Sequence, residues 1–417
     1  SLTVTFAARP ATAGSLTVVV TTTSQSSGSA VEVATVVPVV TSSTAALLAN
    51  ASTLTINGFG FDPTSANNSV TLSNGAVGTI ASATATVLTV TLTTKPTSAG
   101  SVTAIVTTNS QISGSAVQVA TVNPVVLANT GNILSASAST LTIIGSGFDT
   151  TLANNSVTFN NGAIGSITAA TASTLTISLL TRPTSVGNLS AIVVTNGVSS
   201  GAAVVVGAVV PSVTANTSNL AANASTVTIS GLAFSPTASH NTVVFNNGAV
   251  GTVTAATATT LTVTFSTKPT GPGSLTAIVT TNSKASGKAI QVATVTPVIT
   301  PSSASLAANA NTVTISGFGF DVVPSRNVVT FNNGAVGVVT AASATSLTVT
   351  FSSKPTAAGA LTASVTSNGI AGSSAIQIAS VIPVVSANTT ARLNADASGL
   401  TITGVGFSTT AANNVVS

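Results

Sequence analysis

Three sets of residues recur along this chain at one common interval, and this repetition constrains the fold more than any other feature. A basic residue followed by proline recurs in steps of 86 or 87 residues, at Arg9, Lys95, Arg182, Lys268 and Lys354. A second proline series shows the same steps, at Pro38, Pro124, Pro211, Pro297 and Pro383. A phenylalanine series does so as well, at Phe61, Phe148, Phe234, Phe320 and Phe407. Three independent markers with one period predict a tandem array of structural units of about 86 residues.

The second proline series gives the predicted unit boundaries. The whole repeats are expected at 39–124, 125–211, 212–297 and 298–383. Residues 1–38 match the C-terminal part of a repeat, and residues 384–417 match the N-terminal part. We expect the chain to be an excerpt of a longer repetitive polypeptide. The alternative is a subunit whose open ends complete one another head to tail in a filament.

Within one repeat the hydrophobic pattern has a period of two residues, which is typical of strands. Apolar and threonine positions alternate in Thr53-Leu54-Thr55-Ile56, and the same alternation returns at Leu88, Val90 and Leu92. Gly, Pro and Asn clusters separate these runs, and no run shows a helical stripe. About six or seven short strands in 86 residues predict an all-β fold, a tandem array of immunoglobulin-like β-sandwich domains.

The phenylalanine series closes a Gly-x-Gly-Phe element at the end of a predicted strand. This element could be mistaken for a phosphate-binding loop, but no Lys-Ser/Thr pair and no helix follow it. The structural interpretation is that glycine permits a bend and phenylalanine fills the core, because Phe is nearly the only large side chain present. We therefore expect Phe61, Phe148, Phe234 and Phe320 to be buried, with Phe407 their counterpart in the last, partial repeat.

Asparagine-glycine pairs predict tight hairpin turns. They occur in Asn160-Asn161-Gly162, Asn246-Asn247-Gly248 and Asn332-Asn333-Gly334. Both central positions of a type I′ turn need positive φ, which Asn and Gly tolerate. A sugar-binding or ion-binding role for these amides is the alternative interpretation.

Prolines also mark the junctions between repeats. The segments around Pro124, Pro211 and Pro297 leave almost no room for a flexible tether. Proline restricts its own φ and extends the residue before it. We expect stiffly coupled domains in an elongated array.

Charge is almost missing from the composition, and this excludes several classes of function. Of 417 residues, nine are Lys or Arg and five are Asp or Glu, and the chain has one His and no Cys. No catalytic, cofactor-binding or metal-binding set is predicted, and we expect no enzyme activity. The net charge of +4 is not clustered, which argues against nucleic-acid binding. The longest apolar run, residues 202–210, is too short to insert into a membrane.

Most of the few charges fall into a repeating pattern. An aspartate follows the phenylalanine in the repeats that also carry a basic residue before proline, which predicts intradomain ion pairs Asp62–Lys95, Asp149–Arg182 and Asp321–Lys354. The third repeat has Ser235 in place of the aspartate, so the pair is not obligatory. A lysine isopeptide crosslink is a sharper alternative, but arginine cannot form it.

These motifs resemble the IPT/TIG family of immunoglobulin-like repeats. The second repeat reads Leu141-Thr142-Ile143-Ile144-Gly145-Ser146-Gly147-Phe148, followed by Val157-Thr158-Phe159-Asn160-Asn161-Gly162. The match extends over essentially the whole chain, although Leu232-Ala233 replaces the second glycine in the third repeat, so that turn is expected to differ. The resemblance implies a β-sandwich without catalysis, in members that are commonly part of bacterial cell-surface proteins.

A surface of Thr, Ser, Asn, Ala and Val offers little electrostatic repulsion between identical copies. We therefore expect an extracellular or cell-surface structural protein that assembles with copies of itself, head to tail and laterally, into a fibre, sheath or surface layer. The alternatives are the stalk of a large surface adhesin, or a module that binds a glycan or protein ligand, which the sequence does not identify. The lack of Trp and Tyr platforms disfavours the binding module.

Overall fold

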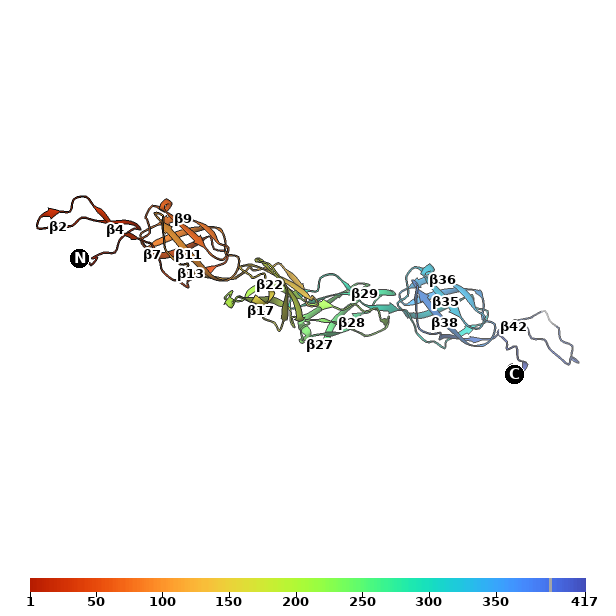
Figure 1. The fold of residues 1–417 in the computed structure, drawn as a ribbon. Coiled ribbons are helices and arrows are strands. Elements are labelled where there is room, and N and C mark those ends of the chain that lie inside the picture. The colour runs from red at the N-terminus through yellow and green to blue at the C-terminus, as the bar shows by residue number, and fades with distance from the viewer. Residues whose placement is uncertain (390–391) are drawn as a thin grey trace. The chain divides into compact units, whose positions relative to one another are not determined.

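The structure is a computed structural model, and it describes residues 1–389 and 392–417. It confirms the predicted fold class, because the chain forms a tandem array of immunoglobulin-like β-sandwich domains (Figure 1). In the described residues, the helical segments are single 3₁₀ turns of three residues each. Two compact units, Ser1–Val209 and Val210–Ser417, are described separately below.

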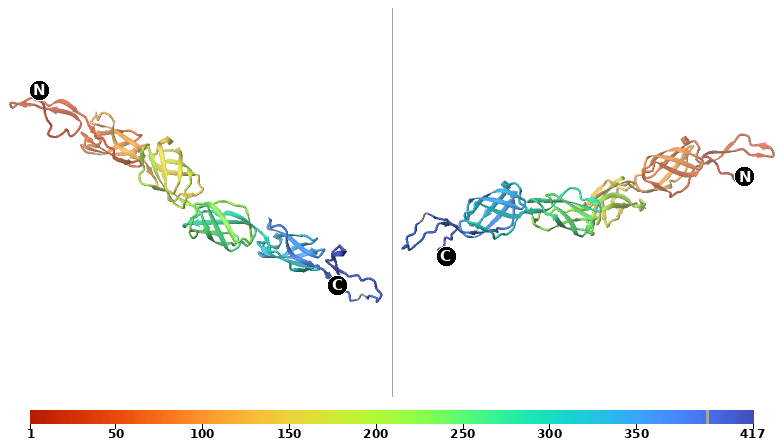
Figure 2. Two further views of the ribbon diagram at one scale, coloured as in Figure 1. Left: turned by 90° about the horizontal axis from the view of Figure 1, so that it is seen from below. Right: turned by 180° about the vertical axis from the view of Figure 1, so that it is seen from behind.

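The first complete sandwich shows the plan that the others follow. Its strands are β5 (Val39–Val40), β6 (Ala46–Leu48), β7 (Thr53–Phe59), β8 (Asn68–Leu72), β9 (Val77–Ala83), β10 (Val87–Thr94), β11 (Gly100–Thr108), β12 (Gln111–Ile112) and β13 (Val117–Asn123), with the 3₁₀ turn η1 (Ser65–Asn67) before β8. Seven of these strands have three or more residues, and β5 and β12 have two residues each. This sandwich is drawn in orange in Figure 2.

Two sheets make up this sandwich. One has the strand order β5-β7-β10-β9 and is antiparallel throughout. In the other, β11 lies between β8 and β13, and β6 joins β13 in a parallel pair. The strands β8 and β9 follow one another in sequence but belong to different sheets. Each is an outer strand of its own sheet, because β8 pairs only with β11 and β9 only with β10.

The second sandwich completes the first unit. It contains β14 (Val125–Val126), β15 (Ile133–Ser135), β16 (Thr140–Ser146), η2 (Leu152–Asn154), β17 (Asn155–Phe159), β18 (Ile164–Ala170), β19 (Thr174–Thr181), β20 (Gly187–Thr195), β21 (Val198–Ser199) and β22 (Val204–Val210). Before the first sandwich, β1 (Gly14–Val18) pairs with β4 (Val31–Val36), and β2 (Thr21–Thr22) pairs with β3 (Gln25–Ser26).

The second unit holds two further sandwiches with the same strand order. The first contains β23 (Ser212–Val213), β24 (Asn219–Ala221), β25 (Thr226–Leu232), η3 (Ala238–His240), β26 (Asn241–Phe245), β27 (Val250–Ala256), β28 (Thr260–Thr267), β29 (Gly273–Thr281), β30 (Lys284–Ala285) and β31 (Ile290–Thr296). The next contains β32 (Val298–Ile299), β33 (Ser305–Ala307), β34 (Thr312–Phe318), η4 (Pro324–Arg326), β35 (Asn327–Phe331), β36 (Val336–Ser343), β37 (Ser346–Ser353), β38 (Gly359–Ser367), β39 (Ile370–Ala371) and β40 (Ile376–Ile382). The unit ends with β41 (Val384–Val385), β42 (Gly404–Val405) and η5 (Ala411–Asn413).

The alternation in the sequence becomes the two faces of each sheet. In β7, Leu54 and Ile56 are buried while Thr53 and Thr55 are exposed. The cross-strand neighbours of these threonines are also threonines, because β10 pairs Thr91 with Thr53 and Thr89 with Thr55. β-Branched side chains favour this extended backbone, so the outer face supports the strand while the inner face supplies the core.

The recurring phenylalanines lie in the cores. Phe61, Phe148 and Phe320 are fully buried, Phe234 is 2% exposed, and Phe407 in the last partial repeat is half-buried. Each ring packs over a glycine three residues earlier. At Gly145, for example, an added Cβ would overlap the Val125 carbonyl oxygen and the Phe148 ring. The first glycine of Gly-x-Gly-Phe is therefore required by close packing rather than by its backbone angles.

The second glycine of the motif has a left-handed backbone, and the third repeat keeps this turn despite its departure in sequence. Gly147 has φ of 76°, and Ala233 at the equivalent position has φ of 58°. The turn was expected to differ there, but Ala233 adopts the same conformation. Non-glycine residues pay roughly 1–2 kcal/mol for this region, a cost that the surrounding sandwich has to offset.

Candidate functional site: the joints between repeats

Successive sandwiches within one unit are joined through a single proline. Pro124 separates the last long strand of one sandwich, β13, from the first strand of the next, β14. Pro124 in the first unit and Pro297 in the second are buried, as is Pro211 next to the boundary of the two units, whereas Pro383 is exposed. A linker of one restricted residue leaves few backbone torsions about which the neighbours can rotate.

A backbone hydrogen bond crosses each of two joints in the first unit. The Ala13 amide donates to the Gly60 carbonyl oxygen, and the Ala99 amide donates to the Gly147 carbonyl oxygen, both at 2.8 Å. Close packing accompanies the second of these bonds, because a Cβ added to Gly147 would lie 2.5 Å from the Ala49 Cβ. The second glycine of the motif is thus a contact point between sandwiches as well as a turn residue.

An aspartate and an asparagine complete these joints. The Asp149 Oδ1 accepts a hydrogen bond from the Thr151 amide at 2.8 Å, and its Oδ2 accepts one from Asn196 Nδ2 at 3.0 Å. The same Asn196 Nδ2 donates to the Ala99 carbonyl oxygen of the preceding repeat, also at 3.0 Å. Asp149 therefore holds the asparagine that reaches across the joint, and Asp62 and Asn109 repeat this arrangement at Ala13.

These contacts stabilise the ionised form of both aspartates. A hydrogen bond from the Thr64 amide, then one from the Asn109 side chain, hold the pKa of Asp62 below its usual value. The Thr151 amide and then the Asn196 side chain lower the pKa of Asp149 in the same way. Donors that favour the carboxylate over the neutral acid lower the pKa of an aspartate.

The stability of the joints should accordingly decrease at acid pH. Since the folded-state pKa of Asp149 lies below the unfolded value of about 3.9, its contribution is present above that value. It should be lost as pH falls through the lower folded-state pKa. Thermal unfolding followed from pH 7 to pH 2 should show a decline below pH 4 that is smaller in Asp149→Asn. Glu32→Gln removes a carboxylate outside these joints and should leave the wild-type decline intact.

A buried asparagine supports the loop that carries each aspartate. Asn155 is 8% exposed, and its Nδ2 donates to the Asp149 carbonyl oxygen at 2.7 Å and to the Thr151 carbonyl oxygen at 3.1 Å. Its Oδ1 accepts hydrogen bonds from the Asp149 amide at 3.1 Å and from the buried Thr195 hydroxyl at 2.8 Å. One side chain thereby satisfies four polar groups and links the loop to β20.

The roles of these asparagines were not predicted from the sequence. The buried set recurs with the repeat, at Asn68, Asn155, Asn241 and Asn327. The joint-forming pair Asn109 and Asn196 also follows the repeat, and the equivalent positions in the second unit are Asn282 and Asn368. Their signal was the same interval of 86 or 87 residues that revealed the prolines, hidden by the many other asparagines of the chain.

The predicted ion pairs are not formed, and this prediction is corrected by the sheet register. Asp62 follows the C-terminal end of β7, whereas Lys95 follows the C-terminal end of the antiparallel β10, which lies beside the start of β7. The two residues are therefore at opposite ends of a seven-residue strand, or roughly 20 Å apart at about 3.4 Å per residue. The same register separates Asp149 from Arg182 and Asp321 from Lys354.

The structure gives these residues other partners. Lys354 Nζ donates to the Asn309 carbonyl oxygen at 2.8 Å, and Asp321 lies 3.5 Å from Arg326 in the ion pair found among the described residues. The third repeat has Ser235 in the aspartate position, and its Oγ lies 3.5 Å from Nδ1 of His240. His240 thus occupies the place that Asn67 occupies beside Asp62.

At two joints the basic residue before proline contacts an aromatic ring of the following repeat. The Arg9 guanidinium lies 4.7 Å from the centre of the Phe59 ring, and Lys268 Nζ lies 5.2 Å from the centre of the Phe318 ring. Both distances are within the range of cation–π attraction. Arg9 and Lys268 therefore act between repeats, although the sequence predicted that the basic residues act within one repeat.

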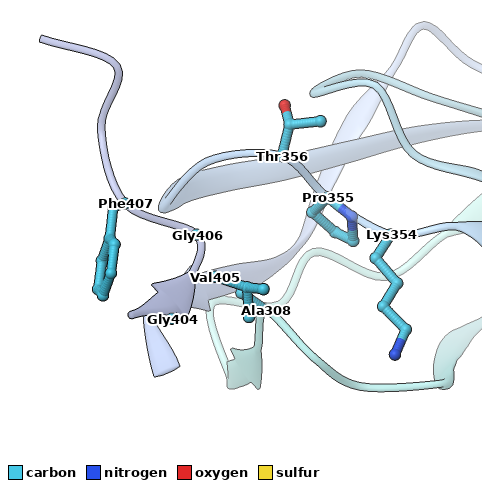
Figure 3. Close-up of a pocket in the computed structure, with 8 residues that line it drawn as sticks. All are labelled: Ala308, Lys354, Pro355, Thr356, Gly404, Val405, Gly406 and Phe407. Atoms are coloured by element: carbon cyan, nitrogen blue, oxygen red, sulfur yellow. The ribbon is translucent and has the colours of Figure 1, made fainter. Parts of the chain in front are cut away.

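The joints in the second unit vary this plan. Ala358 donates its amide to the Gly406 carbonyl oxygen at 2.9 Å, as in the first unit. At the preceding joint the equivalent residue is Pro272, which has no amide hydrogen to donate. A shallow hollow of about 360 Å³ at this joint is lined by Ala308, Pro355 and Gly406, with Lys354 and Phe407 on opposite sides of it (Figure 3).

The asparagine-glycine turns have the left-handed backbone that the sequence predicted. Asn161 and Gly162 both have positive φ, at 57° and 68°. The Asn161 side chain is engaged with its own protein, donating to the Ser185 carbonyl oxygen at 2.6 Å and accepting from the Ser185 amide at 3.1 Å. Within the same residues, no three His, Cys, Asp or Glu side chains are grouped as a metal site would require.

The described part of the chain also holds no helix with the length and apolar character needed to cross a membrane. Comparisons with protein-family models and with curated proteins find no match for this chain.

Among solved structures, 121 chains match. A three-Ig-domain structure of titin is 11% identical, with 62% of this chain and 95% of that chain covered and a TM-score of 0.19. An ICAM-5 ectodomain fragment is 14% identical, with 80% and 97% covered and a TM-score of 0.20. The S-layer protein rSbsC is 15% identical at a TM-score of 0.17, and this chain, 84% of which is aligned, spans 56% of it. The fold assignment rests on the strand order given above.

Proposed function

We propose that this chain is a non-enzymatic structural protein of the cell exterior, whose immunoglobulin-like repeats assemble with copies of themselves into a fibre, sheath or surface layer. The observation that carries this proposal is the surface, which combines very few charges with apolar side chains exposed at the same place in each repeat. The chain of 417 residues has nine basic and five acidic residues. The exposed apolar position is Val77, Ile164, Val250 and Val336 in the four sandwiches, each 56–58% exposed.

This surface has a physical consequence for association. Repulsion between like-charged copies normally keeps soluble proteins apart, and here little of it exists. Small side chains such as Thr, Ala and Val allow two sheets or sheet edges to approach closely. Because the attraction would be mostly apolar and hydrogen-bonded, assembly should change little with salt concentration.

The joints favour a second candidate, the stalk of a cell-surface adhesin. A one-residue proline linker, a backbone hydrogen bond and the Asp149–Asn196 contact would all restrict bending between neighbouring sandwiches. A stalk needs this stiffness but no lateral contact between copies. The two functions therefore differ in what the purified chain does at high concentration.

Electron microscopy and sedimentation of the purified chain over a range of concentrations test the choice. A structural assembly predicts ordered filaments or sheets that persist from low to high salt. Chains that stay separate at every concentration would exclude self-assembly and leave the stalk as the better proposal. Microscopy of the native material should then show either a continuous ordered layer or isolated projections.

A further inference from the structure

One outer strand of each sandwich, β9 in the first, forms a sheet edge that has little protection against pairing with another strand. It is the longest strand that has a neighbour on one side only, because β10 pairs with it and no other strand does. Its equivalents are β18, β27 and β36, each paired only with the following strand. An unpaired edge presents free amide and carbonyl groups to any strand that approaches.

Soluble proteins generally protect such edges with charged residues, prolines or bulges. The four edge strands here read VGTIASA, IGSITAA, VGTVTAA and VGVVTAAS, so none contains a charged residue or a proline. Each edge has two register irregularities, for example between Thr89 and Val90 opposite β9. Bulges are thus the protection that remains, and they leave the second to fourth residues of each strand, Gly78 to Ile80 in β9, as a short segment of regular pairing.

The exposed apolar position that recurs in every sandwich lies immediately before this segment. Val77 begins β9 and is 56% exposed, and the outward residue two places further along is the small Thr79. Beside the edge, a hollow of about 460 Å³ opens between β8 and β9, lined in part by Val70, Gly78 and Ile80. A strand laid against β9 would cover the valine and border this hollow.

We propose that the β9 edge and its three equivalents form the lateral interface between copies of this chain, by pairing with the same edge of a second copy. The proposal rests on the self-assembly proposed above and specifies its surface. An edge that pairs with its own copy does so antiparallel about a twofold axis, which places the valine of each strand on the partner's edge.

Two features favour a second copy over another partner. The edges carry no charge that would select an oppositely charged ligand, and two uncharged edges do not repel each other. Each chain has four equivalent edges, so a second copy brings the same set at the same intervals.

A lysine placed at the centre of each edge tests the proposal. The edge variant carries Thr79→Lys, Ser166→Lys, Thr252→Lys and Val338→Lys, all at exposed positions. The matched control carries Thr55→Lys, Thr142→Lys, Thr228→Lys and Thr314→Lys, which are exposed on the central strands β7, β16, β25 and β34. Both variants add four charges to the same kind of sheet face, and circular dichroism with thermal unfolding checks that both remain folded.

We expect the edge variant to raise the concentration needed for lateral assembly at least about tenfold, because each pairing would bring two lysines together at a desolvated edge. The control should assemble close to the wild-type concentration. Hydrogen exchange should also show new protection of the β9 amides in wild-type assemblies.

The other outcomes separate this inference from the proposed function. Equal loss in both variants would mean that surface charge in general prevents assembly, and equal assembly in both would mean that another surface mediates it. Either result overturns the edge interface while the structural function stands. A wild-type chain that never assembles would overturn both.

Discussion

Replacing Phe61 with alanine is expected to destabilise its sandwich by about 3–5 kcal/mol. The ring is fully buried in a core that includes Leu54, Ile56 and Leu88, and it covers Gly58 at the end of β7. Removing it leaves a cavity between the two sheets that these side chains cannot fill without moving the strands. Hydrogen exchange resolved to individual repeats, or calorimetry of the transition that belongs to this sandwich, measures the loss.

Phe59→Ala is the matched control, because it deletes the same ring two residues earlier in the same segment. Phe59 is 42% exposed, and its ring contacts the Arg9 guanidinium at the joint. We expect it to cost less than about 1 kcal/mol, the value of an exposed cation–π contact. Equal effects of the two substitutions would show that the core of this sandwich does not depend on the recurring phenylalanine.

The second large effect is expected at the buried asparagine that supports the aspartate loop. Asn155→Ala removes the partners of the Thr195 hydroxyl, the Asp149 amide and two carbonyl oxygens. Buried polar groups that lose their partners cost about 1–3 kcal/mol each, and water that enters the vacated space recovers part of this. We expect a net destabilisation of about 3 kcal/mol, measured by denaturant unfolding.

Ser156→Ala provides the comparison, because Ser156 is the exposed residue immediately after Asn155 and its side chain is not among the partners of Asp149. A change within about 0.5 kcal/mol is expected there, as for most surface substitutions. Asn155→Ala should in addition weaken the pH dependence of the joint, since the loop that positions Asp149 loses its support. A loss of stability without any change in the acid region would place Asn155 in the core alone, without a role in the joint.

Much of the fold could be predicted because its signals are local and repeated. Alternation in Thr53-Leu54-Thr55-Ile56 determines which face of β7 is buried, since successive side chains of a strand point to opposite faces. The position of Phe61 after a glycine-containing strand end made its burial an expected consequence of being the largest apolar side chain nearby. Recurrence at 86 or 87 residues extended each local inference to the other repeats.

The ion pairs illustrate what local pattern cannot provide. Asp62 and Lys95 share a repeat and have opposite charges, so the sequence made them plausible partners. Their separation depends on the antiparallel register of β7 and β10, which places them at opposite ends of a sheet. Register is a property of paired strands, and a composition of small, alternating residues gives no sign of which strand ends meet.

The sequence by itself determined that this chain is a repetitive, charge-poor β protein, because composition and periodicity are sums over neighbouring residues. Only the tertiary structure decided how the repeats are joined. The Ala99 amide reaches Gly147, and Asn196 reaches Ala99, across 48 and 97 positions of sequence. Such contacts follow from the folded positions of three separate loops, and packing of the complete sandwiches brings those loops together.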